Sequence, residues 1–109
     1  MSVHTWPDVL DALVLGHDLD ARSTAWAMAS ILDGESTPAQ IAAFAVALRA
    51  KGISQAELQG LVDALLSRAT LVEVPGLVVD VVGTGGDRAK TVNISSMSAV
   101  TAAGAGAPV

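Results

Sequence analysis

The sequence predicts an α/β family fold in which this chain is mostly α-helical. We expect an N-terminal helical domain over residues 1–70, followed by the first strand, glycine loop and helix of an incomplete α/β domain over residues 71–109. Two observations predict this order. Four segments before residue 70 combine helix start signals with apolar residues at helical spacing. A short β-branched run then leads directly into a glycine-rich loop, and small helix-compatible residues follow it.

The bulk composition fits a folded domain and excludes several classes of protein. The chain is 51% hydrophobic and 16% charged, which argues against disorder. It has no cysteine, which excludes disulfides and thiolate metal sites. Its first residues carry no secretory signal, and its purest apolar run, residues 41–48, is far shorter than the ~20 residues that span a bilayer. We therefore expect a cytoplasmic protein without a membrane partner.

The charge distribution indicates an anionic ligand rather than nucleic acid. The net charge is −5, which disfavours a broad nucleic-acid surface. All eleven acidic residues lie at or before Asp87, and residues 88–109 carry Arg88 and Lys90 with no acid. The segment after the glycine loop is therefore locally positive.

The first predicted helix opens at Thr5, a suitable N-cap. Pro7 falls in its first turn, and the Asp8 carboxylate suits the positive end of a helix. We expect this helix to run to about Leu15 and to stop at Gly16.

The second predicted helix begins near Asp20 and ends before Gly34. Its expected apolar face consists of Ala25, Met28, Ala29 and Leu32. Trp26 lies off this face, so it should contact either another helix or another subunit.

The third and fourth helices start with capping boxes, at residues 37–40 and 54–57. The third helix should end at residues 51–52 and, being apolar on most sides, should be buried on several of them. The fourth should end near Arg68 or Ala69. The expected buried faces are Ile41, Phe44, Ala45 and Leu48 on the third helix, and Leu58, Leu61, Val62 and Leu65 with Leu66 beside them on the fourth.

Residues 77–82 predict a strand buried on both faces, as in a parallel sheet. A helix should follow from Ser95 to Ala103, capped by Ser95 or Asn93 and ended by Gly104 and Gly106. Residues 107–109 resemble the entry to a second strand. Because a parallel strand needs a partner beside it, we expect the chain to be a piece of a longer protein, rather than one whose sheet another chain completes.

The loop at residues 82–87, Val-Gly-Thr-Gly-Gly-Asp, is interpreted as a phosphate-binding loop. Glycines allow positive φ and close approach of a ligand, and the next helix adds its positive end. A plain hairpin turn is the alternative. The spacing fits neither a Walker A motif nor the dinucleotide fingerprint. Asp87 would repel phosphate, so it should accept from sugar hydroxyls or from metal-bound water.

The residues on both sides of the loop form longer motifs that resemble a known protein family. Residues 80–87, Asp-Val-Val-Gly-Thr-Gly-Gly-Asp, followed by Thr-Val-Asn-Ile-Ser-Ser at 91–96, resemble the anthranilate phosphoribosyltransferase family. Residues 37–44 and 47–52 are similar to the N-terminal domain of that family. The resemblance covers nearly all of the chain. Pyrimidine nucleoside phosphorylases resemble the helices, but their loop carries an insertion before the aspartate that is absent here.

The resemblance implies binding roles for the loop and the helix start. Gly83 would lie where the anthranilate site meets the phosphoribosyl pyrophosphate (PRPP) site, and Ser95 would help hold a magnesium ion on pyrophosphate. Ser96 stands where the family usually has threonine, and Arg88 and Lys90 match no family position. The implied PRPP-binding residues are Gly83, Gly86, Asp87, Thr91, Asn93, Ile94, Ser95 and Ser96.

The implied reaction transfers the phosphoribosyl group of PRPP to anthranilate, with Mg²⁺, in tryptophan biosynthesis. No residue of this chain is expected to be catalytic, and His4 and His17 are interpreted as surface or capping histidines. The resemblance also implies a homodimer through the N-terminal helices. Because the remaining site residues would come later, this chain alone should be inactive. The alternatives are a helical dimerisation module, or a related phosphoribosyl- or nucleoside-processing enzyme with another acceptor.

Overall fold

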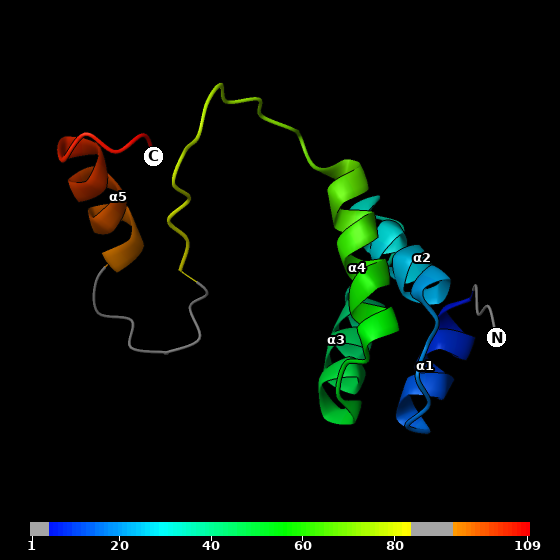
Figure 1. The fold of residues 1–109 in the computed structure, drawn as a ribbon. Coiled ribbons are helices and arrows are strands. Elements are labelled where there is room, and N and C mark those ends of the chain that lie inside the picture. The colour runs from blue at the N-terminus through cyan, green and yellow to red at the C-terminus, as the bar shows by residue number, and fades with distance from the viewer. Residues whose placement is uncertain (1–4, 84–92) are drawn as a thin grey trace. The chain divides into compact units, whose positions relative to one another are not determined.

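The computed structural model describes residues 5–83 and 93–109, and it divides the chain into two compact units (Figure 1). The helical unit is Met1–Thr70 and the C-terminal unit is Leu71–Val109. Within the described ranges the chain forms five helices and no strand. No described helix is long and apolar enough to cross a membrane.

The helical unit contains α1 (Trp6–Val14), α2 (Ala21–Leu32), α3 (Pro38–Lys51) and α4 (Gln55–Arg68). All four predicted starts are confirmed by side chains that accept a hydrogen bond from the backbone N–H three residues on. These caps are Thr5, Asp20, Thr37 and Ser54. Both capping boxes are present, so each helix start is fixed by contacts within its own first turn.

Helix ends also agree with the sequence. Gly16, Gly34 and Gly52 follow α1, α2 and α3 with φ of 79°, 76° and 91°. This left-handed region favours glycine, because other residues meet a steric penalty from Cβ.

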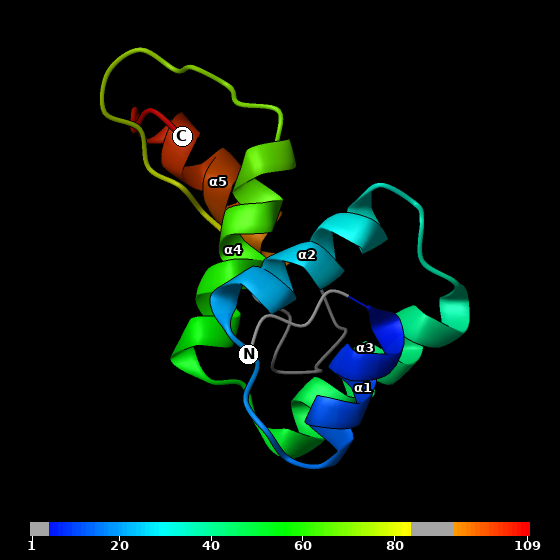
Figure 2. The same cartoon turned by 90° about the vertical axis from the view of Figure 1, so that its right-hand side faces the viewer.

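Helices α2 and α4 make the most extensive contact of the unit, and α1 packs mainly against α3 (Figure 2). The α2–α4 contact is close because one residue in it lacks a side chain. A Cβ atom on Gly60 would overlap the carbonyl oxygen of Ala21 and the hydroxyl of Thr24. The backbones of α2 and α4 can therefore approach only because position 60 is glycine.

The buried faces of α2 and α4 differ from those expected. The residues buried on the two helices are Ser23, Thr24, Ala27, Ser30, Glu57, Gly60 and Ala64. Of the expected α4 face only Leu61 is half-buried, whereas Leu58 and Leu66 are 53% and 61% exposed. On α2, Leu32 is exposed as well, whereas Ala25, Met28 and Ala29 of the expected face are half-buried. Small side chains permit the closest helix approach, so the larger ones are left outside the contact.

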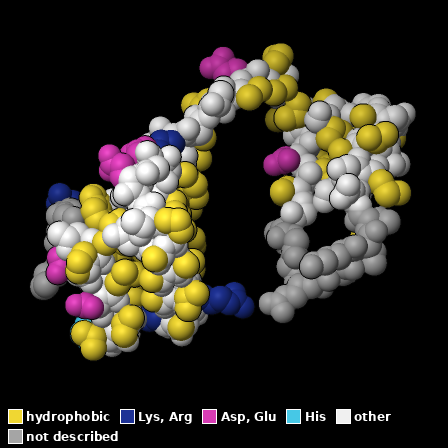
Figure 3. All heavy atoms as spheres, turned by 180° about the vertical axis from the view of Figure 1, so that it is seen from behind, with side chains coloured by type: hydrophobic (Ala, Val, Ile, Leu, Met, Phe, Trp, Pro, Cys, Tyr) yellow, Lys and Arg dark blue, Asp and Glu magenta, His cyan; other side chains and the backbone are white. Residues whose placement is uncertain are grey.

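Helix α3 is also less buried than its composition predicts. Of its expected face only Phe44 and Leu48 are buried, and Val46 is 68% exposed. Figure 3 shows hydrophobic side chains spread widely over the surface of the helical unit. The expectation that α3 is buried on several sides is wrong for this chain, because α1 covers one side and the other elements cover little more.

The core of the helical unit is built on aromatic contacts. The ring centroid of Trp6 lies 5.6 Å from that of Trp26 and 5.7 Å from that of Phe44, in tilted and edge-on arrangements. Val9, Leu13 and Leu19 join the same cluster. Of the two contacts expected for Trp26, the structure provides the one with another helix, α1.

A buried network, here called the polar clip, joins the α1–α2 connection to the α3–α4 connection. The Glu57 carboxylate is fully buried and accepts from the N–H of Leu19, the N–H of Ser54 and the ammonium of Lys51 at 2.9, 2.7 and 2.9 Å. Lys51 also donates to Asp18 and to the Gly52 carbonyl. Burial opposes the charge on Glu57, but these donors outweigh it and hold its pKa below the usual value.

The C-terminal unit contains α5 (Ile94–Gly104), one residue longer at each end than predicted. Residues 77–82 form no strand, and Leu77 is 94% exposed. Within the described residues this segment makes one backbone hydrogen bond to a distant part of the same chain, from the Val79 N–H to the Pro108 carbonyl at 2.8 Å. A strand requires a ladder of such bonds, so the prediction of a strand buried on both faces is wrong here.

Candidate functional site

The two ends of the glycine loop lie in the described part of the C-terminal unit. Gly83, the first glycine of the loop, is the last residue described on its N-terminal side, and Asn93 is the first described residue after it. Three predicted site residues, Gly86, Asp87 and Thr91, lie outside the described residues.

The structure brings Gly83 and Ser95 together. A Cβ atom on Gly83 would lie 2.5 Å from the Ser95 hydroxyl oxygen and 3.7 Å from the Ser95 Cβ. The first distance is shorter than any ordinary contact, so the hydroxyl occupies the space that a side chain at position 83 would fill. The first glycine of the loop and the first turn of α5 therefore belong to one local site.

The start of α5 offers donors to an anion. Asn93 is the N-cap, but its side chain makes no capping hydrogen bond. As at every helix start, the N–H groups of the first turn have no partner within the helix and lie at its positive end. Ile94 and Ser96 are exposed and Ser95 is half-buried. The arrangement suits a phosphate oxygen, with N–H groups and two hydroxyls as donors.

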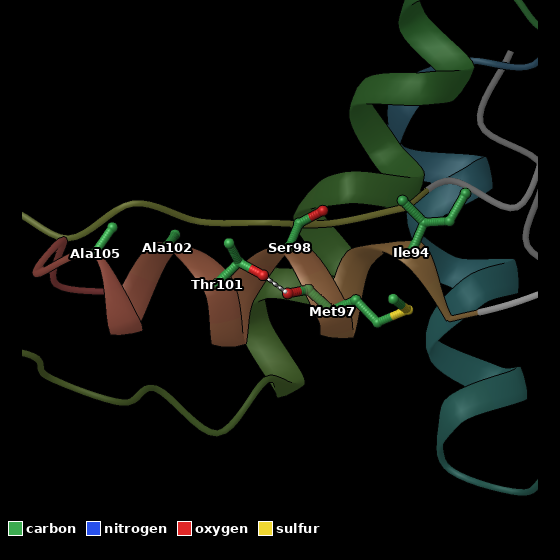
Figure 4. A pocket seen from close by; sticks show the side chains of 6 residues that line it. All are labelled: Ile94, Met97, Ser98, Thr101, Ala102 and Ala105. Atoms are coloured by element: carbon green, nitrogen blue, oxygen red, sulfur yellow. Dashed lines mark hydrogen bonds between the residues drawn. The ribbon is translucent and has the colours of Figure 1, made fainter.

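A separate apolar hollow of about 530 Å³ lies along α5 (Figure 4). It is lined by Ile94, Met97, Ser98, Thr101, Ala102 and Ala105. The Thr101 hydroxyl is directed back to the Met97 carbonyl, 2.8 Å away, and so offers its proton to the helix itself. With so little polar surface, this face suits packing against another element and not phosphate binding.

The Ser95 hydroxyl fits a magnesium ion whose other ligands come mainly from a bound phosphate compound and from water. Magnesium prefers oxygen ligands, keeps several waters, and is commonly bound through substrate phosphates with few protein ligands. A single hydroxyl beside the start of α5 can serve as one such ligand. Among the described residues no cluster of three or more His, Asp or Glu side chains forms a metal cage.

Of the two histidines, His17 is exposed, as expected of a surface histidine, and His4 lies outside the described residues.

Comparison with known families agrees with a helical domain followed by the start of an α/β domain, and identifies a glycosyl transferase family. The helical bundle domain of that family matches residues 7–69, its a/b domain matches residues 75–109, and the chain belongs to this family.

Curated relatives make the resemblance more specific. The chain is 63% identical over 105 residues to a Nocardioides sp. protein named anthranilate phosphoribosyltransferase, covering 96% of this chain and 31% of the relative. It is 58% identical over 109 residues to the protein of that name from Streptomyces griseus, and 52% identical over 109 residues to that from Thermobifida fusca. Both of these matches cover 100% of this chain and 31% of the relative. The chain thus spans about a third of the length of these relatives, and the resemblance stated from its motifs is confirmed.

Proposed function

We propose that the protein that carries this chain transfers the phosphoribosyl group of PRPP to anthranilate. The products are N-(5-phosphoribosyl)anthranilate and pyrophosphate, and the step belongs to tryptophan biosynthesis. The observation that carries the proposal is the contact of Gly83 with the Ser95 hydroxyl at the start of α5. It occurs in a chain 52–63% identical to relatives named for this activity.

The residues of this chain would bind and orient PRPP. The N–H groups and hydroxyls from Asn93 to Ser96, with Gly83, Gly86 and Thr91, would hold pyrophosphate oxygens, and Asp87 would accept from ribose hydroxyls or from metal-bound water. Gly83 would also border the anthranilate site. Ser95 would contribute a hydroxyl to the magnesium ion, which when bound neutralises charge on the pyrophosphate.

The chemistry needs positioning more than acid–base groups. The anthranilate nitrogen would form a bond to C1 of the ribose while the bond from C1 to the pyrophosphate oxygen breaks, and the nitrogen would lose a proton. Negative charge grows on the leaving group, so N–H groups already aimed at it stabilise the transition state.

The test uses the full-length protein. PRPP should bind in the presence of MgCl₂, measured by calorimetry, and anthranilate should be consumed when PRPP is added. Failure of the full-length protein to bind PRPP would overturn the proposal. Binding of PRPP without consumption of anthranilate would instead favour a related transferase with another acceptor. The 109-residue chain alone should show no turnover.

The helical unit supports a second role, association of two copies. Val14, Leu15 and Val46 on or next to α1 and α3 are exposed, and exposed apolar patches commonly mark interfaces. Trp26 is half-buried and packs against Trp6, so it would offer only part of its ring to such an interface. Sedimentation of the full-length protein should show a homodimer, and replacement of Val46 by Asp should shift it toward monomer. A protein that stays monomeric at high concentration would rule this role out.

The proposed setting is the cytoplasm, and the proposed partners are PRPP, anthranilate and a second copy. The absence of cysteine agrees with this setting.

A further inference from the structure

Gly83 is not required by its backbone conformation. Its φ is not positive, unlike that of Gly76 in the same unit, whose φ is 88°. A residue with a side chain therefore meets no penalty from φ at position 83. The restriction visible in the structure is one of space.

The space at position 83 is limited by one atom. An added Cβ would meet the Ser95 Oγ at 2.5 Å, whereas its 3.7 Å distance to the Ser95 Cβ is an ordinary van der Waals contact. The Ser95 Oγ turns about a single bond with three staggered positions. A methyl group at position 83 would therefore displace the hydroxyl to another rotamer and leave the main chain of α5 where it is.

We propose that Gly83 is a positioning residue for the Ser95 hydroxyl. By having no side chain, it allows the Ser95 hydroxyl to lie against the main chain at the first glycine of the loop. This inference rests on the proposed function, in which that hydroxyl meets the magnesium pyrophosphate end of PRPP. Gly83 then acts on PRPP through Ser95, in addition to any contact that its own backbone makes.

The proposal predicts that the losses of PRPP affinity caused by changing Gly83 and Ser95 are not additive. We compare the full-length wild type with Gly83→Ala, Ser95→Ala and the double variant, and measure PRPP affinity by calorimetry in excess MgCl₂. Each single variant should weaken binding about tenfold, the loss expected for one hydrogen bond or ligand contact to a charged group. The double variant should bind no more weakly than Ser95→Ala alone, because the atom displaced by the new methyl group is already gone.

The chain offers a matched control. Gly104 lies in the same unit, its φ is not positive, and a Cβ there would meet nothing within 4 Å. Gly104→Ala should bind PRPP like the wild type. All variants should unfold at the wild-type temperature, which separates loss of binding from loss of fold.

The outcomes distinguish this inference from the proposed function. If the wild type binds no PRPP, the proposed function fails. If the wild type binds but Gly83→Ala also binds normally, or if the two losses add in the double variant, the positioning role is overturned. A crystal structure of Gly83→Ala gives a readout that does not depend on PRPP. The Ser95 Oγ should have changed rotamer over an unchanged main chain, and an unmoved hydroxyl would contradict the inference.

Discussion

The carboxylate of Glu57, at the first turn of α4, accepts a hydrogen bond from the backbone N–H of Leu19, 38 positions earlier in the chain. The bond ties the α1–α2 connection to the start of α4. The same carboxylate closes the capping box with Ser54 and pairs with Lys51, so a single side chain fixes both connections.

Replacement of Glu57 by Gln should therefore destabilise the helical unit. The amide keeps one acceptor oxygen, but its NH₂ group would face donors that the carboxylate now accepts from, and Lys51 would keep only Asp18 as an anionic partner among the described residues. The free energy of unfolding should therefore fall by about 2 kcal/mol. Urea unfolding measures the loss. Asp63→Asn is the matched control, because Asp63 lies exposed on the same helix. Equal free energies of unfolding for the two variants would show that the charge of Glu57 in the polar clip does not stabilise the helical unit.

The polar clip should also make stability depend on pH in the acid range. The pKa of the Glu57 carboxyl is lowered from 4.5 in the folded chain, so as pH falls the unfolded chain takes up this proton first. The stabilisation is fully present above pH 4.5 and is lost as pH falls through the folded pKa. Urea midpoints measured from pH 6 downward, at steps of about one unit, should decline below 4.5. The decline should be shallower in the Glu57→Gln variant, and identical slopes would refute the assignment to Glu57.

Replacement of Gly60 by Ala should be strongly destabilising, although alanine is the better helix former. The new methyl group would overlap the Ala21 carbonyl oxygen, a backbone atom that cannot turn away, so α2 and α4 must move apart. We expect a loss of about 2 kcal/mol or more, the cost of forcing volume into a packed contact. Thermal unfolding, with Gly104→Ala as the control, checks this; a variant as stable as the wild type would mean that the contact is looser than described.

The ion pair between Arg68 and Asp33 should matter little. The Arg68 guanidinium makes two bonds to the Asp33 carboxylate, at 2.8 and 2.6 Å, but both side chains are exposed. Exposed pairs are screened by salt and contribute little to folding. Arg68→Ala should leave the urea midpoint in 0.15 M salt (the roughly physiological ionic strength) unchanged within error. A clear drop that persists at high salt would indicate a role beyond the ion pair.

Helix boundaries could be predicted from the sequence because their causes are local. Thr37 and Ser54 make their capping bonds within one turn, and Gly52 stops α3 by its own conformation. The buried faces could not be predicted in the same way. Leu58 fits the apolar spacing of α4, yet the face that packs is the one that carries Gly60, because closeness to α2 decides it.

The candidate site likewise has parts that the sequence could predict and parts that it could not. The loop and Ser95 could be identified from a motif, which is a local pattern. The contact between Gly83 and Ser95 could not, because it depends on the path of the chain between them. Residues 77–82 have the composition of a strand, but a strand is a property of two segments, and Val79 has only the Pro108 carbonyl as a partner in the described chain.

The polar clip has one further consequence, for proteolysis. The Lys51 ammonium donates to Asp18, Glu57 and the Gly52 carbonyl, which uses all three of its protons, and its side chain is 6% exposed. Trypsin must draw a lysine side chain into its own pocket, so the bond after Lys51 can be cut only once the clip has opened. The rate of cleavage at this one bond would thus report how often the two connections separate in the native protein.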